Sequence, residues 1–212
     1  MTKKLGIWII LAWVSGAVPA MAAAEAALIT SLNGKVVRIG ADAPVEAFVK
    51  LKSGDNLTLE KDAQIQITYF ENGRQESWRG TGKLAIGTQE SQGTGLPAAQ
   101  VKQLPLAIVK QIARTPSLDS QGRAGVMRLR AIPTPDAIAK IDETYRQMRS
   151  ETAKNDLNPE IYLLSGMLEM RELDRVDQVL TDLREAHPGS MEAKVLVALY
   201  QKTLKNLRES GK

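Results

Sequence analysis

Short runs in which apolar and polar residues alternate, separated by glycine turns, extend over residues 27–87. In the clearest run, AQIQITYF at residues 63–70, the residues at every second position are apolar up to Tyr69. A period of two predicts a strand with one buried face. Asn72-Gly73 follows and favours a hairpin turn. We expect about four to six short strands in a small sandwich or rolled sheet, including a strand pair around Asn33-Gly34.

The polar stretch TQESQGTGLP, residues 88–97, is rich in glycine and predicts a linker. Beyond it the pattern becomes largely helical over residues 98–155. We expect a short helix that Pro105 ends and a second helix over residues 106–114. GVMRLRAI at residues 125–132 alternates again, which predicts one strand that returns to the N-terminal sheet. Asp136 is the predicted cap of the next helix.

The last part of the chain, residues 156–208, has apolar residues at helical spacing. Asn158-Pro159 predicts the start of a helix, because asparagine caps and proline is tolerated in the first turn. A second helix follows after a turn near Arg171 and ends before Pro188-Gly189. These two form a predicted helical hairpin, and a final helix completes it. The fold class is therefore α+β, with a small all-β part before a helical part.

The N-terminus reads as a secretory signal peptide. Lys3 and Lys4 precede the apolar run at residues 5–18, and the small residues around Ala20-Met21-Ala22 form an A-x-A cleavage site. The run is short for a membrane span, which needs about 20 residues, although a retained anchor is the alternative reading. We expect residues 1–22 to be removed by cleavage after Ala22, and no later run could span a bilayer.

Charge and cysteine content narrow the compartment and the partners. The chain has 28 Lys and Arg against 24 Asp and Glu, and loss of Lys3 and Lys4 brings it near neutrality. Charges of both signs are interspersed, without the basic stripe and stacking aromatics that nucleic acid requires. There is no cysteine, hence no disulfide and no thiolate metal site. We expect a bacterial periplasmic protein that does not bind nucleic acid.

Residues 28–86 resemble the periplasmic domain of FecR-type proteins. The shared elements are a glycine-containing strand at Gly34-Lys35-Val36, a Gly54-Asp55 pair before Leu57, the alternating strand at residues 63–67, and Phe70-Glu71-Asn72-Gly73. FecR proteins span the membrane and control a sigma factor through a cytoplasmic segment. We expect a cleavable leader and no such segment in this chain, so the resemblance implies the fold and not the signalling role.

The helical hairpin resembles a tetratricopeptide repeat. Ile161, Leu164, Ser165 and Leu168 match its first helix, and Val176, Leu180, Leu183 and Pro188 match its second. In such a repeat Tyr162, Gly166 and Glu169 would face the concave binding side. The alternative is that these residues only pack on the preceding helix near Tyr145.

The sequence contains few residues in patterns that are typical of catalytic sites. Its one histidine, His187, lies at a predicted helix end, where interaction with the helix dipole is the simpler reading. GTGK at residues 80–83 lacks the spacing and the Ser or Thr of a phosphate loop, and no Asp or Glu pair is singled out for glycan cleavage. We expect a protein that is not an enzyme and has no cofactor and no metal site.

Trp78 is the only tryptophan beyond the predicted leader. Packing in the core is one interpretation. In the other, Trp78 is partly exposed between Arg74 and Arg79, and Arg128 and Arg130 join that surface if their strand pairs nearby. Tryptophan and arginine are frequent among residues that dominate binding energy.

The sequence thus predicts a non-catalytic, protein-binding adaptor or accessory of an envelope assembly, with an envelope protein as its partner. The candidate binding residues are Trp78, Arg74, Arg79, Arg128, Arg130, Tyr162 and Glu169. The alternative is a module that binds glycan or peptidoglycan, with Trp78 stacked on a sugar ring.

Overall fold

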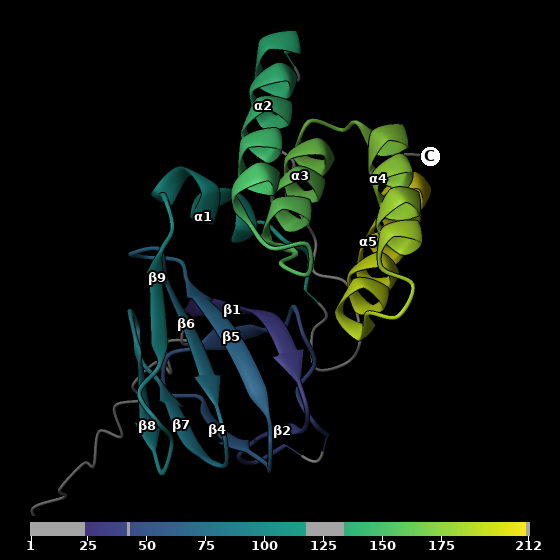
Figure 1. Ribbon diagram of the computed structural model, residues 1–212. Coiled ribbons are helices and arrows are strands. Elements are labelled where there is room, and N and C mark those ends of the chain that lie inside the picture. The colour runs from purple at the N-terminus through teal and green to yellow at the C-terminus, as the bar shows by residue number, and fades with distance from the viewer. Residues whose placement is uncertain (1–23, 42, 118–133, 211–212) are drawn as a thin grey trace, which may run out of the picture.

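The structure is a computed structural model that describes residues 24–41, 43–117 and 134–210. In this part of the chain all strands precede all helices, and Figure 1 shows the helices grouped at one end of the two sheets. The predicted α+β class is confirmed. The predicted leader and the predicted returning strand with Arg128 and Arg130 lie outside the described residues. No helix in the described ranges is long and apolar enough to cross a membrane.

The β-part is a sandwich of two antiparallel sheets. One sheet has the strand order β3-β1-β5-β6-β9 and the other β2-β4-β7-β8. The strands of the first sheet are β1 (Glu25–Asn33), β3 (Lys50–Lys52), β5 (Gln64–Tyr69), β6 (Arg74–Arg79) and β9 (Gln100–Gln103). Those of the second are β2 (Val36–Arg38), β4 (Asn56–Leu59), β7 (Gly82–Ile86) and β8 (Ser91–Thr94). Apolar side chains from both sheets form one buried cluster between them.

The period of two in residues 63–70 is confirmed as the buried face of β5. Ala63, Ile65, Ile67 and Tyr69 are all buried in the sandwich core. The predicted hairpin is also confirmed, because β5 pairs antiparallel with β6 through a turn at Gly73. Gly73 has φ of 73°, and a Cβ there would lie 2.5 Å from the Leu104 carbonyl oxygen. Both the backbone conformation and the close approach therefore require glycine.

The strand pair predicted around Asn33-Gly34 is wrong. β1 pairs with β3 and β5, whereas β2 pairs with β4 in the other sheet. Gly34 has φ of 84°, and a Cβ there would lie 2.9 Å from the Ala63 Cα. The glycine thus takes the chain from one sheet to the other at a point of close packing, and alternation alone does not separate such a corner from a hairpin.

The predicted linker at residues 88–97 and the domain end at residue 87 are also wrong. Residues 91–94 form β8, which pairs with β7. A Cβ on Gly93 would lie 2.5 Å from the Trp78 ring, so this glycine serves close packing. The short helix expected before Pro105 is instead β9, which pairs with the edge of β6. The β-part consequently extends to Gln103.

Five helices follow in the described residues. They are α1 (Leu106–Ile112), α2 (Pro135–Glu151), α3 (Asn158–Glu169), α4 (Leu173–Ala186) and α5 (Met191–Ser210). The cap of α2 is Thr134, whose hydroxyl accepts from the Ala137 N–H, and Asp136 lies inside the first turn. Leu157 is at the cap position of α3, so Asn158 is already helical. Both predicted caps are therefore displaced along the chain.

α3 is the central helix of the helical part and lies between α2 and α4 (Figure 1). Every residue from Asn158 to Leu168 is buried. A Cβ on Gly166 would lie 2.9 Å from the Ile141 side chain of α2, so the glycine permits this close approach. α3 therefore has no free face for the residues predicted on a concave surface.

A chain of buried hydroxyl groups joins α1, α3 and α5. Thr115 donates to the Ile112 carbonyl at 2.6 Å and lies 3.2 Å from the Ser165 oxygen, which lies 2.6 Å from the Tyr200 oxygen. Each hydroxyl has one proton to donate, so Ser165 donates to Thr115 and Tyr200 donates to Ser165. Burial raises the pKa of the Tyr200 phenol well above its usual range. Tyr200 thus stays neutral and holds this connection.

The β-part and the helical part share one apolar core. Leu28, Phe48 and Leu104 of the β-part belong to the same buried cluster as Val109 and Ile112 of α1 and the apolar residues of α3. Phe48 is 1% exposed and has φ of 64°, a conformation that costs a residue with a side chain about 1–2 kcal/mol. Its N–H donates to the Ile29 carbonyl at 2.7 Å. The contacts of its ring in the shared core offset this backbone cost.

Replacing Phe48 tests this account. Phe48→Ala and Phe48→Gly both remove the ring, and each is expected to lower the free energy of unfolding by about 3–5 kcal/mol. The glycine variant should be the more stable of the two by about 1 kcal/mol, because only glycine adopts this φ without strain. Urea denaturation of both variants gives the difference.

Ala139, inside α2 and exposed, is the matched control. There glycine is expected to be less stable than alanine by about 1 kcal/mol. A Phe48→Gly variant less stable than Phe48→Ala would contradict the strained conformation at Phe48.

Candidate functional site

Trp78 lies in the core of the sandwich. It is 7% exposed, its ring contacts Gly93 of β8, and its Nε1 donates to Glu76 Oε2 at 3.0 Å. The hypothesis of an exposed tryptophan is therefore wrong, and the ring has no free face for a sugar. The packing partner is a glycine in the stretch that the sequence pattern presented as a linker.

Arg74 is held by a fully buried carboxylate. Glu76 accepts from Arg74 Nε at 2.6 Å and from the Ser91 N–H at 3.2 Å. The hydroxyl of Ser91 is 2.6 Å from that of Tyr69, so β8 of one sheet is joined to β5 and β6 of the other. Hydrogen bonding to Glu76 raises the pKa of Arg74. This network gives Arg74 a structural role in the sandwich.

Arg79 is exposed on β6 and donates to Gln64 Oε1 at 3.1 Å. It lies next to Trp78 in sequence, but the tryptophan faces the core. Arg128 and Arg130 lie outside the described residues. The structure therefore does not bring these residues together as the predicted Trp–Arg surface.

Tyr162 and Glu169 do not form a concave binding face. Tyr162 is 8% exposed within the helical core, and Glu169 forms an ion pair with Arg114, just after α1. Together with the contact of Gly166 with Ile141, these positions hold α3 against its neighbours. The alternative interpretation, packing on the preceding helix near Tyr145, agrees with the contact of Gly166 with Ile141 of α2, whereas Glu169 is paired with Arg114 beside α1.

The helical part has a groove that these predictions missed. Its volume is about 540 Å³. α2 and α4 form its walls, and Glu160 and Leu163 of α3, both almost fully buried, lie between them. The lining residues are Asp142, Tyr145, Arg146, Glu160, Leu163, Arg175, Gln178, Val179, Asp182, Leu183, Ala186 and His187.

The groove follows α4 along nearly its whole length. It runs from Arg175 in the first turn to His187 just after the last, which is about 18 Å at the rise of an α-helix. Arg175 donates to both carboxylate oxygens of Asp142 at 2.8 Å. This paired interaction joins the two walls at one end and raises the pKa of Arg175. The other end of the groove lies beside His187, where the chain turns from α4 to α5.

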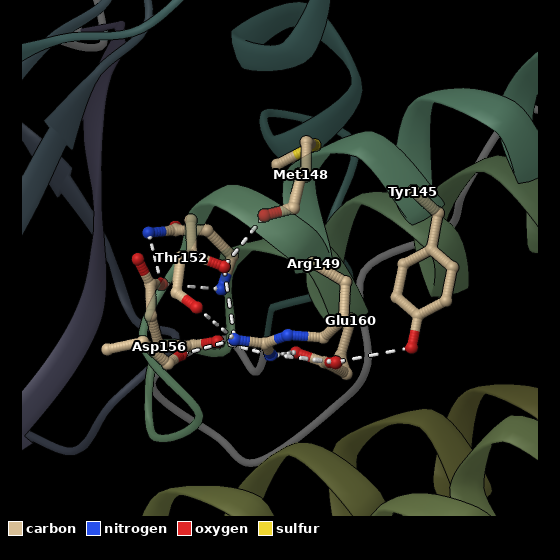
Figure 2. Close-up of polar contacts among 8 residues, drawn as sticks. Tyr145, Met148, Arg149, Thr152, Asp156 and Glu160 are labelled. Carbon is tan, nitrogen blue, oxygen red and sulfur yellow. Dashed lines mark hydrogen bonds and ion pairs between the residues drawn. The ribbon is translucent and has the colours of Figure 1, made fainter.

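Glu160, which lines the groove, is the buried carboxylate of an ion pair with Arg149 (Figure 2). Glu160 of α3 is 6% exposed, and Arg149 of α2 donates to both of its oxygens at 3.0 Å. Arg149 also donates to the Asp156 carbonyl at 2.9 Å and to the Thr152 hydroxyl at 3.0 Å. The guanidinium thus neutralises the carboxylate and satisfies backbone groups where α2 ends, which fixes α2 against α3.

Tyr145 connects this ion pair to the groove. Figure 2 shows its phenol oxygen pointing toward Glu160, to which it donates at 3.4 Å. Burial, with the negative charge of Glu160, raises the pKa of Tyr145. Its ring lines the groove with Leu163, Val179 and Leu183. The groove therefore presents apolar surface whose nearest buried charges are already paired.

The groove offers binding contacts from apolar, charged and amide side chains. Arg146 and Gln178 are exposed at its walls. Among the described residues, no group of His, Asp and Glu side chains is arranged to hold a metal ion. The spacing of apolar residues predicts the helices that line the groove. It does not predict the groove itself, because the walls come from helices that are distant in the chain.

Comparison of the chain with protein-family models, with curated proteins and with solved structures found no match. The FecR-like and tetratricopeptide-like resemblances therefore stay predictions.

The Arg149–Glu160 pair is expected to be essential for the groove. Arg149→Ala leaves a buried carboxylate without its partner and should lower the free energy of unfolding by about 3–5 kcal/mol. Arg175→Ala breaks an ion pair whose arginine is 44% exposed, so about 1 kcal/mol or less is expected. Equal losses in urea denaturation would contradict the structural role of the buried pair.

The buried phenol of Tyr69 predicts a loss of stability at high pH. Burial raises its pKa to about 12 from 10, so the unfolded chain releases this proton first. The contribution of the protonated phenol to the free energy of unfolding is intact below pH 10. About 2–3 kcal/mol of it is lost as the pH rises to 12. Denaturation at several pH values should show this decline in the wild type and a smaller one in Tyr69→Phe. An identical decline in both would contradict it.

Proposed function

We propose that this chain is an exported, non-catalytic adaptor or accessory of an envelope assembly, and that it binds a segment of a partner protein in the groove along α4. The observation that carries the proposal is the groove itself, a largely apolar channel with polar edges between α2 and α4. A volume of about 540 Å³ is within the usual range of ligand sites.

The chemistry of the groove suits a peptide segment. Tyr145, Leu163, Val179 and Leu183 supply apolar contacts, while Arg146 and Gln178 supply hydrogen-bond donors at the edge. An apolar centre within a polar rim is typical of protein interfaces. Because Asp142 and Glu160 already have arginine partners, apolar side chains can enter without leaving a buried charge unpaired.

The walls of the groove are fixed before a partner arrives. The Asp142–Arg175 contact joins α2 to α4, and the Arg149–Glu160 pair joins α2 to α3. The shared core holds all of these helices on the sandwich. A preformed site loses little conformational entropy on binding, which favours affinity from a small contact area.

Support for export comes from the leader predicted at residues 1–22 and from the absence of cysteine. Both family resemblances would also agree with function through protein contacts. The glycan alternative depended on an exposed Trp78, and burial of that ring leaves no observation in its favour.

Blocking the groove tests the proposal. A library of random dodecapeptides displayed on phage is selected on the mature chain, and the selected peptides are measured against Ala186→Trp. Ala186 is exposed at the groove wall, so the indole fills the groove without entering the core. At least about a tenfold loss of affinity is expected, which is 1.4 kcal/mol.

The control is Ala107→Trp, an exposed alanine on α1 outside the groove. It should bind the selected peptides as the wild type does. The proposal fails if no peptide is selected, or if the selected peptides bind both tryptophan variants equally well.

A further inference from the structure

A second hollow lies between the end of α4 and the first half of α5. Its volume is about 220 Å³. Pro188, Ala193, Val197 and Ala198 supply apolar surface. The remaining lining residues are Arg184, His187, Lys194 and Gln201. We name this hollow the α4–α5 pocket.

The α4–α5 pocket differs from the groove in its charge. Arg184 and Lys194 are both exposed at its edge, and no carboxylate lines it. In the described ranges neither cation takes part in an ion pair, whereas the groove pairs Asp142 with Arg175. Two unpaired cations beside apolar surface are complementary to a ligand that carries a carboxylate next to an apolar group.

The two hollows are neighbours at the turn between α4 and α5. His187 lines both of them. Arg184 lies on a different face of α4 from the groove residues Asp182 and Ala186, so a segment along the groove would pass around the end of α4 at His187 to reach the α4–α5 pocket. One continuous ligand can contact apolar surface in the groove and cations at its end.

We infer that the partner segment is acidic at one end, and that its acidic end binds at the α4–α5 pocket. An apolar side chain of the segment enters the pocket, and a neighbouring Asp or Glu contacts Arg184 and Lys194. This inference rests on the proposed function and adds the charge and the direction of the ligand. A protein segment fits better than an anionic membrane surface, because the cations flank a hollow that shares His187 with the groove.

The test measures charge reversal on the same selected dodecapeptides. Those that bind the mature chain should be enriched in Asp or Glu next to an apolar residue. Arg184→Glu and Lys194→Glu are each expected to weaken their binding about tenfold. The control is Lys110→Glu, an exposed lysine on α1, which should leave binding unchanged. Binding should also weaken as salt rises.

The outcomes separate this inference from the proposed function. Peptides that lose affinity in Ala186→Trp but bind both charge-reversed variants normally would overturn the acidic end and leave the groove intact. Peptides sensitive to charge reversal but not to Ala186→Trp would support the pocket and overturn the groove. Phosphatidylglycerol vesicles could also bind the wild type more tightly than any peptide and fail to bind the charge-reversed variants. That result would overturn the inference of a protein ligand in favour of a membrane surface.

Discussion

The arrangement of the two parts depends on one apolar core that the sandwich shares with the helices, and Phe48 is buried in that core. Its ring lies in the core that the sandwich shares with α1 and α3, and its strained backbone is held by hydrogen bonding to β1. The hydroxyl chain of Thr115, Ser165 and Tyr200 continues this connection from α1 to α5. Because both parts pack on one core, the helices keep fixed positions, and the groove between α2 and α4 is preformed.

The local elements were largely predictable from the sequence. The alternation at residues 63–70 specifies which face of β5 is buried, and Asn72-Gly73 specifies the hairpin, since both depend on neighbours in the chain. The glycines led to wrong predictions where they contact residues that are distant in the chain. Gly93 fits against Trp78, and Gly34 fits against Ala63. A single sequence does not distinguish a glycine that permits close packing from one that permits flexibility. For this reason residues 88–97 were predicted to be a linker.

The candidate site was less predictable for the same reason. Trp78 and Tyr162 are residue types that often bind, but the fold buries both. The groove instead depends on pairs that are distant in sequence, such as Asp142 with Arg175. The approach of Ile141 to Gly166 sets the distance between α2 and α3. No single-sequence pattern contains these spacings, although each helix that lines the groove was expected.

The most direct measurement is site-specific photocrosslinking in the intact envelope. A benzoylphenylalanine is placed at Gln178, an exposed glutamine in the groove, or at Gln100, an exposed glutamine on the edge strand β9. Our account predicts a discrete protein adduct from position 178 and none from position 100. An adduct from position 100 alone would contradict it, because the working surface would then be the sandwich and not the helical groove.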